Sequence, residues 1–268
     1  MFDKHTSTSG LIRAERYLNG EDTLQPVCRD AEIHAIRDAV RPLTKRNTSE
    51  TLLIHGPPGT GKTVCVNHVF DALDRETSVK PIQINCWQYS TRPALLTELL
   101  IQLGYPAPRK GKPVDELLSK LREWLDKNRC VALSLDEFDQ LQDKTEVAYD
   151  LHMLSQQTQN KLGLVLISNL PPDEMFLDSR SWSRLNSRIL KFEPYTTNQL
   201  QAILQNTAEQ AFKPGAVTDN LIEAIADEAA ENRGDCREAF NRLLQAGQHA
   251  VQNNAREVTQ QDLVKVDG

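Results

Sequence analysis

Apolar runs and helix-like patterns alternate along the chain as far as residue 192. Five runs have the length and apolar composition of buried strands. They lie at residues 51–54, 81–86, 130–135, 162–167 and 189–192. Between them, apolar side chains recur every three or four positions, as they do from Val66 to Leu73 and from Leu117 to Leu125. Strands that alternate with helices predict an α/β fold with a parallel, doubly wound sheet.

The pattern changes at Tyr195, after which we expect helices only. Thr196 is followed three positions later by Gln199, which is a capping-box signal for a helix start. Helices are predicted at residues 197–211, 219–232 and 235–252, with a short one after Thr259. The chain is therefore predicted to have three parts, namely an N-terminal arm at 1–26, an α/β domain at 27–194 and a helical domain at 195–268.

The first predicted strand runs directly into the loop Gly56-Pro57-Pro58-Gly59-Thr60-Gly61-Lys62-Thr63, which fits the pattern G-x-x-x-x-G-K-[ST]. Glycines allow backbone N–H groups to turn inward around a phosphate chain. In this pattern the lysine reaches the β- and γ-phosphates, and the hydroxyl of the last residue ligates Mg²⁺. The predicted strand before the loop and helix after it favour a site for ATP or ADP with Mg²⁺ over a chance glycine-rich turn.

Polar residues also end two of the other predicted strands. Asp136 and Glu137 follow the run at 130–135, and Asn169 follows the run at 162–167. Carboxyl ends of neighbouring parallel strands share one crevice. We therefore expect Asp136 to hold Mg²⁺ and Glu137 to orient and deprotonate the attacking water, rather than to form an exposed acidic turn. Asn169 is expected to hold that water or to sense the γ-phosphate, although an Asn before two prolines also suits a turn.

Several basic residues have two interpretations each. Arg180, Arg184 and Arg188 recur every fourth residue, so one of them is either an arginine finger to a neighbouring subunit or part of a solvated face. Arg237 either reaches the nucleotide or pairs with a nearby carboxylate at the surface. The remaining basic positions either contact DNA or are solvated surface. They are Arg92, Arg109, Lys110 and Lys112.

Composition narrows the class of protein. The 268 residues carry a net charge of −6, so any contact with nucleic acid has to come from a local basic patch. The five cysteines are scattered and do not have metal-ligand spacing, which predicts reduced thiols in a cytosolic protein. The chain has neither an apolar run of membrane-spanning length nor a signal-peptide core at its N-terminus, and we expect no membrane partner.

Taken together, the motifs resemble a known family. Gly56–Thr63, Leu135-Asp-Glu-Phe-Asp139, Ser168-Asn169, Ser183-Arg184-Leu185 and Gly234-Asp-Cys-Arg237 occur in the order of an AAA+ ATPase. With Ile84-Asn-Cys86 and Phe192-x-Pro-Tyr195, they resemble the archaeal replication initiators related to the origin recognition complex and cell division control protein six. The resemblance covers roughly residues 10 to 266 and implies an AAA+ fold followed by a small helical lid domain.

The resemblance also implies residue roles. Lys62 and Thr63 bind phosphate and Mg²⁺, and Asp136 and Glu137 are the metal-binding and catalytic carboxylates. Asn169 corresponds to the first sensor, Arg237 to the second, and Arg184 to the arginine finger, with Arg180 as the second choice. Val27 to Arg29 corresponds to the segment that walls the adenine, Tyr195 belongs to the nucleotide site, and Thr91 to Leu103 corresponds to the helix that meets duplex DNA.

The expected function is a slow ATPase that serves as a switch in DNA replication initiation. Expected partners are double-stranded DNA and either other initiator subunits or the replicative helicase, in the nucleoid region of the cytoplasm. The family usually continues into a winged-helix domain, which we expect this protein to lack unless the chain is partial, and Cys28 stands where the family often has His. The alternatives are an AAA+ regulator or transposition-helper-like scaffold that acts on proteins, and a metabolic P-loop kinase.

Overall fold

A five-stranded parallel sheet forms the centre of one of the two units into which the chain divides. The computed structural model describes residues 10–19, 25–47, 51–106, 111–127, 129–175 and 187–263. The strand order is β2-β3-β4-β1-β5. The strands are β1 (Leu52–His55), β2 (Lys80–Asn85), β3 (Val131–Asp136), β4 (Leu162–Ser168) and β5 (Arg188–Lys191). This unit comprises Arg29–Gly56 and Lys62–Phe192.

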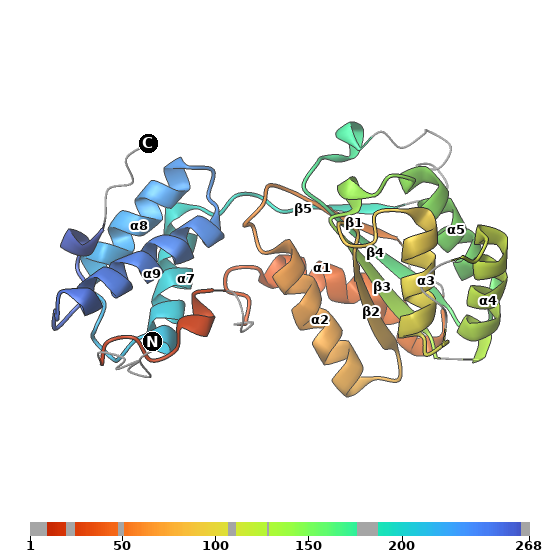
Figure 1. The fold of residues 1–268 in the computed structure, drawn as a ribbon, viewed down its shortest axis with the longest axis horizontal. Helices are drawn as coiled ribbons and strands as arrows, with labels where there is room; N and C mark the ends of the chain where they lie inside the picture. The colour runs from red at the N-terminus through yellow and green to blue at the C-terminus, as the bar shows by residue number, and fades with distance from the viewer. Residues whose placement is uncertain are drawn as a thin grey trace. The chain divides into compact units, whose positions relative to one another are not determined.

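Helices cover both faces of this sheet, giving three layers (Figure 1). On one face lie α1 (Asp30–Val40) and α2 (Lys62–Glu76), and on the other lie α3 (Arg92–Gln102), α4 (Val114–Lys127) and α5 (Lys144–Gln157). Strand side chains alternate between two apolar clusters: Leu52 and Ile54 of β1 belong to the cluster with α1 and α2, whereas Leu53 belongs to the other. Because both faces are covered, the central strands β1, β3 and β4 are nearly continuous apolar runs.

The outer edge of β2 is protected against pairing with another strand. Pro81 has no N–H to offer, and the carbonyl of Gln83 accepts a 3.1 Å hydrogen bond from Nε2 of Gln102 on α3. At the end of the strand, the carbonyl of Asn85 accepts the N–H groups of Gln88 and Tyr89 in the following turn. The edge nearest the predicted catalytic strand is thereby closed by the chain itself.

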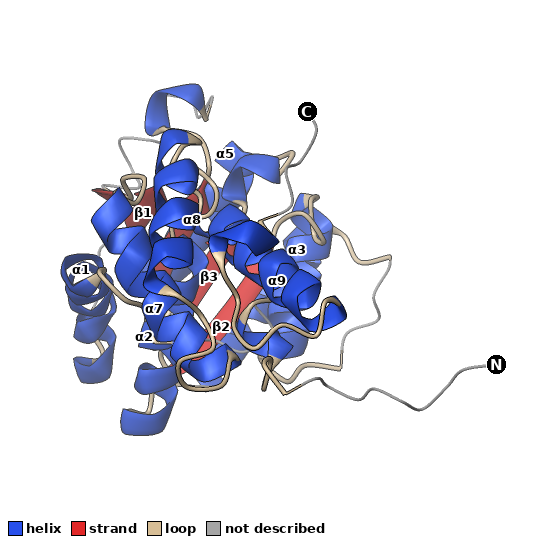
Figure 2. Cartoon of the chain, turned by 90° about the vertical axis from the view of Figure 1, so that its left-hand side faces the viewer, coloured by secondary structure: helices blue, strands red, loops and turns tan. Residues whose placement is uncertain are grey.

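The second unit is built mainly from three helices, α7 (Thr197–Ala211), α8 (Asp219–Glu231) and α9 (Cys236–Gln252) (Figure 2). It comprises Met1–Cys28, Pro57–Gly61 and Glu193–Gly268. Helix α7 begins with the predicted capping box of Thr196 and Gln199. The N-terminal segment belongs to this unit because Leu11, Ile12 and Leu18 are buried in its apolar cluster.

The predicted α/β sheet followed by a helical region is confirmed, with local corrections. The strand expected at 81–86 begins one residue earlier, and the short helix after Thr259 is a single 3-10 turn, Gln260–Asp262. The segment expected as an irregular arm contains a 3-10 turn, Glu15–Tyr17, and packs on α7. Among the described residues, no helix combines the length and the apolarity needed to cross a bilayer.

Candidate nucleotide-binding site

The predicted phosphate loop follows β1 and leads into α2. Strand β1 ends at His55, and α2 begins at Lys62. Gly56 lies so close to the backbone of Phe192 that a Cβ would be 2.2 Å from the carbonyl oxygen of Phe192. Only glycine fits at this point, where the chain leaves the sheet.

Lys62 is a buried cation that is held at the carboxyl end of the sheet. Its side chain is 6% exposed. Nζ donates hydrogen bonds to the carbonyl of Gly56 at 2.6 Å and to Oδ1 of Asn169 at 3.0 Å. A buried ammonium group requires such acceptors, because its desolvation is otherwise unfavourable. The structure therefore brings together Lys62 and Asn169, which the sequence separates by 107 positions.

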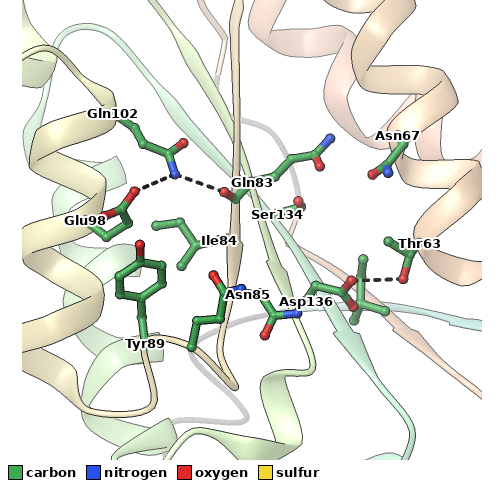
Figure 3. A pocket seen from close by; sticks show the side chains of 12 residues that line it. Thr63, Asn67, Gln83, Ile84, Asn85, Tyr89, Glu98, Gln102, Ser134 and Asp136 are labelled. Atoms are coloured by element: carbon green, nitrogen blue, oxygen red, sulfur yellow. Dashed lines mark hydrogen bonds between the residues drawn. The ribbon is translucent and has the colours of Figure 1, made fainter. Parts of the chain in front are cut away.

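Thr63 and Asp136 form the predicted metal-binding pair. The Thr63 hydroxyl donates a 2.9 Å hydrogen bond to Oδ2 of Asp136, as Figure 3 shows. Mg²⁺ in phosphate-binding sites usually takes one or two protein oxygens together with phosphate oxygens and water. A hydroxyl and a carboxylate at the mouth of a phosphate loop fit that requirement.

Glu137 has an unusual backbone conformation for a side chain of its type. Its φ of 53° and ψ of 43° lie in the left-handed region, which non-glycine residues occupy at a cost. The N–H of Glu137 donates to Oδ1 of Asp136 at 2.9 Å. The 3-10 turn η3 (Phe138–Gln140) follows, with Phe138 and then Leu141 fully buried. These contacts hold the conformation that sets the direction of the Glu137 side chain.

Three carboxylates concentrate negative charge beside this turn. Burial, together with the charges of Asp136, Asp139 and Glu137, raises the pKa of the Cys86 thiol to about 12, against the opposing effect of Lys144. All three carboxylates therefore contribute negative charge at the buried Cys86 thiol. A divalent cation suits this field, because it would be the largest positive charge available to offset it.

A polar pocket of about 290 Å³ adjoins Thr63 and Asp136 (Figure 3). Its other polar side chains come from α2, β2, β3, α3 and the turn after β2. They are Asn67, Gln83, Asn85, Gln88, Tyr89, Glu98, Gln102 and Ser134. The pocket therefore extends from the predicted metal-binding pair to the edge strand of the sheet.

In the helical unit, the middle of the phosphate loop packs on the start of α9. The carbonyl of Gly59 accepts a 3.2 Å hydrogen bond from the N–H of Cys236. Gly59 has a φ of 72°, and a Cβ there would lie 1.7 Å from the carboxylate of Asp235. Asp235 caps α9 by accepting the N–H of Arg237 at 2.8 Å. The exposed Arg237 thus stands on the first turn of the helix that contacts the loop.

Tyr195 lies against the end of the same loop. Its side chain is buried, and its hydroxyl oxygen would be 2.6 Å from a Cβ on Gly61. Thr60 is fully buried, and its hydroxyl donates to the carbonyl of Pro57 at 2.8 Å. Within the helical unit, residues 57–61 of the loop are therefore fixed by the Thr60 hydroxyl and by Tyr195. Tyr195 is also one of the residues predicted to belong to the nucleotide site.

The segment expected to wall the adenine is divided between the units. Val27 is half-buried against the apolar cluster of the helical unit. Arg29 is buried in the sheet unit, where it bonds Glu32 at 2.7 Å and lies over the ring of Phe192 at 5.1 Å. Arg29 thus contributes to the packing of the sheet unit.

The described DNA-contact candidates are engaged within the chain. Arg92 makes a two-pronged contact with Asp150, with Nε to Oδ2 at 2.6 Å and Nη2 to Oδ1 at 2.9 Å. Lys112 pairs with Glu116. The other candidates lie outside the described residues. They are Arg109 and Lys110, together with the finger candidates Arg180 and Arg184.

Comparison with known proteins identifies the family. The family described as "AAA domain" matches residues 45–173, and the "Cdc6 AAA+ ATPase-type lid domain" matches residues 201–267. The "ORC1-type DNA replication protein" of Thermococcus kodakarensis is 32% identical over 99% of this chain and 67% of its own length. This chain belongs to the family of ORC1-type DNA replication proteins.

Solved structures of ORC1-type and Cdc6 proteins share its fold. The Aeropyrum pernix ORC1 protein, solved in complex with DNA, has a TM-score of 0.84 at 28% identity, covering 94% of this chain and 68% of its own. Cdc6p from Pyrobaculum aerophilum has a TM-score of 0.85 at 23% identity, covering 93% of this chain and 69% of its own. The initiator resemblance and the AAA+ fold with a helical lid are thereby confirmed.

This ORC1-type chain matches only part of some relatives. It is 32% identical to the Pyrococcus furiosus ORC1-type protein over 95% of itself and 66% of that protein. It spans 58% of the Pyrococcus abyssi relative.

Asp139 is the last residue of the Leu135–Asp139 motif, and no role was predicted for it from the sequence. Its Oδ1 accepts the N–H of Asn169 at 3.0 Å. Its spacing in the sequence could have indicated a role. Asp139 lies three positions after Asp136, and one 3-10 turn brings its side chain back to the same edge of the sheet.

Proposed function

We propose that this ORC1-type chain binds ATP with Mg²⁺ and hydrolyses it slowly, as a switch in the initiation of DNA replication. The observation that carries the proposal is the meeting of two pairs at the carboxyl end of the sheet, Lys62 with Asn169 and Thr63 with Asp136. Together they offer a buried cation for phosphate, oxygens for a metal ion and a polar side chain for water.

Binding is assigned to the phosphate loop and its neighbours. Backbone N–H groups of residues 56–61 surround the phosphates, and Lys62 exchanges its carbonyl acceptor for phosphate oxygens. Thr63 and Asp136 hold Mg²⁺, which supplies charge neutralisation on the phosphates when bound. We assign Val27, Arg29, Tyr195 and Arg237 to the remaining contacts with the nucleotide, supported by the family membership.

Hydrolysis is assigned to three further residues. Glu137 takes a proton from the attacking water, and its fixed turn supports the directional placement that general-base catalysis requires. Asn169 orients that water or the γ-phosphate. Arg184 is assigned as the finger that a neighbouring subunit supplies, and Arg180 is the second choice.

Double-stranded DNA is the proposed ligand, and other initiator subunits or the replicative helicase are the proposed protein partners. The related Aeropyrum pernix protein was solved in complex with DNA. We assign the contact to α3 and to the basic loop at 109–112, and we place the protein in the cytoplasm at the nucleoid. For Arg92 and Lys112, binding requires that phosphates compete with Asp150 and Glu116.

Nucleotide binding and turnover test the ATPase proposal. Lys62→Ala is expected to abolish ATP binding, because the buried cation for the phosphates is lost. Glu137→Gln is expected to bind ATP normally and to lose turnover. Normal ATP affinity in Lys62→Ala would reject the proposed site, and unchanged turnover in Glu137→Gln would remove Glu137 from its role.

The DNA proposal is tested by fluorescence anisotropy of a labelled random duplex at two salt concentrations, with ADP or a non-hydrolysable ATP analogue. Salt-sensitive binding that depends on the nucleotide is expected. The net charge of −6 favours a second candidate, a nucleotide-dependent regulator of protein partners. Absence of binding at low salt with either nucleotide would favour that candidate.

A further inference from the structure

We propose that Asp139 is a positioning residue that holds Asn169 against Lys62 and so sets the ATPase rate. The proposal rests on the ATPase function proposed above and deepens it. It assigns to the last residue of the Leu135–Asp139 motif a role that is separate from metal binding and from general-base catalysis.

Asn169 needs an anchor because it stands just beyond the end of a strand. Strand β4 ends at Ser168, the last residue of β4 to pair with β1. Asn169 itself is exposed, and backbone beyond a ladder is freer to move. Its N–H donates a 3.0 Å hydrogen bond to Oδ1 of Asp139, so the carboxylate continues the backbone pairing for one more residue.

Asp139 can serve as an anchor because its own turn is fixed. The carbonyl of Asp139 accepts the Lys144 ammonium group at 3.0 Å, and the carbonyl of Leu141 accepts it at 2.9 Å. Phe138 and Leu141 on either side are fully buried in the apolar core. The backbone that carries the Asp139 carboxylate is therefore fixed by the packing of its neighbours and by the hydrogen bonds of Lys144.

The contact reaches the predicted phosphate site in two steps. Asp139 fixes the backbone of Asn169, and Oδ1 of Asn169 accepts the ammonium group of Lys62 at 3.0 Å. The same 3-10 turn begins directly after Glu137. One turn thus fixes both Glu137, the proposed base, and Asn169, the proposed γ-phosphate sensor. Placement matters because a catalytic group displaced by about 1 Å can lower the rate about 100-fold.

A set of variants separates the hydrogen bond from the charge. Asp139→Asn removes the negative charge but retains a carbonyl oxygen that can accept the Asn169 N–H. Asp139→Ala removes both. Gln140→Ala is the matched control, since its amide bonds the other oxygen of Asp139 at 2.7 Å and does not hold Asn169.

Each variant is measured for turnover at saturating ATP and for the ratio of the ADP and ATP dissociation constants. Asp139→Ala is expected to lower turnover by about tenfold or more and to reduce the preference for ATP, with ADP affinity within about twofold of wild type. Asp139→Asn and Gln140→Ala are expected to retain most of the wild-type turnover.

The decisive comparison is a double-mutant cycle with Asn169→Ala. If Asp139 acts through Asn169, then Asp139→Ala costs little further turnover in the Asn169→Ala background. An equal loss in both backgrounds, or loss in Asp139→Asn equal to that in Asp139→Ala, overturns the inference. Failure of the wild-type chain to bind nucleotide, or binding that survives Lys62→Ala, overturns the proposed function and this inference with it.

Discussion

The hydroxyl of Thr63 and the carboxylate of Asp136 are joined by a 2.9 Å hydrogen bond across 73 positions of sequence. The pair links the first turn of α2 to the last residue of β3. If a cation were bound here, the Thr63 hydroxyl would give up this hydrogen bond and present a lone pair of its oxygen to the cation instead. The contact therefore defines where a metal ion would enter.

Thr63→Ala is expected to remove most of the gain in nucleotide affinity that Mg²⁺ provides, because one of two protein oxygens is lost. Titration of a fluorescent ATP analogue, with Mg²⁺ and with a chelator, measures that gain. Thr63→Ser keeps the hydroxyl and should keep the gain. A Thr63→Ala variant with the wild-type response to Mg²⁺ would show that the hydroxyl is not a ligand.

Gly59→Ala is expected to destabilise the helical unit more than a matched glycine substitution elsewhere. Gly59 and Gly215 have nearly the same φ, at 72° and 73°, but a Cβ would meet Asp235 at Gly59 and would have no neighbour within 4 Å at Gly215. Gly215→Ala should cost about 1 kcal/mol from the left-handed backbone alone. Gly59→Ala should cost about 1 kcal/mol more, since Asp235 must give up its cap on α9.

Urea unfolding of the two variants gives that difference. The extra cost should disappear when Gly59→Ala is made together with Asp235→Ala, because the displaced carboxylate is absent. Equal costs for Gly59→Ala and Gly215→Ala would mean that the loop does not press on Asp235.

Arg92→Met is expected to destabilise the sheet unit by about 2 kcal/mol, because it leaves the carboxylate of Asp150 buried without its partner. The Asp150 side chain is 6% exposed and that of Arg92 is 28% exposed, so the full cost of breaking a buried pair is reduced by solvent. Asp150 also raises the pKa of Arg92 through their hydrogen bonds.

Urea unfolding tests this prediction, with Arg75→Ala on the exposed end of α2 as the control. The double variant Arg92→Met with Asp150→Leu should recover part of the loss, since no charge remains buried. If the double variant is less stable than Arg92→Met alone, the unpaired charge of Asp150 is not the cause of the loss, which would contradict this explanation.

The cysteines are expected to differ strongly in reactivity. Burial raises the pKa of the Cys65 and Cys86 thiols to about 12, whereas Cys28 is half-buried. At pH 8, iodoacetamide should therefore modify Cys28 first, as peptide mass spectrometry would show. Early modification of Cys65 or Cys86 in the folded protein would contradict their burial.

The same shifts predict a pH dependence of folding. Between pH 9 and 12, the thiols of Cys65 and Cys86 stay protonated in the folded chain, whereas in the unfolded chain, where their pKa is near 9, they lose their protons. Their contribution to stability is complete below pH 9 and declines as the pH rises towards 12. The free energy of unfolding should fall less between pH 8 and 10 in a Cys65→Ala, Cys86→Ala variant.

The central strands β1, β3 and β4 could be predicted because they are buried on both faces. Leu162–Ser168 is buried along its whole length, so its apolar run stands out from its surroundings. Helix α7 was predicted at its observed bounds because Thr196 and Gln199 carry a local start signal. Features that depend on neighbours in sequence were therefore readable.

Features that depend on tertiary contacts could not be predicted from the sequence. The hydrogen bond between Asp139 and Asn169 joins residues 30 positions apart, which no local pattern records. Arg92 looked like a surface cation, but the buried carboxylate of Asp150, 58 positions away, holds it. Leu11 and Ile12 sit in a polar segment whose apolar partners on α7 and α9 lie far along the chain.

That last packing arrangement bears on how the protein is made. Ile12 forms a bridge with Phe212, so the helical unit joins residues that are 200 positions apart in the sequence. Its apolar cluster stays incomplete until α9 has left the ribosome, and such long-range closure slows folding. A fragment that starts at Glu193 would lack Leu11, Ile12 and Leu18, and would expose the apolar surface that they cover.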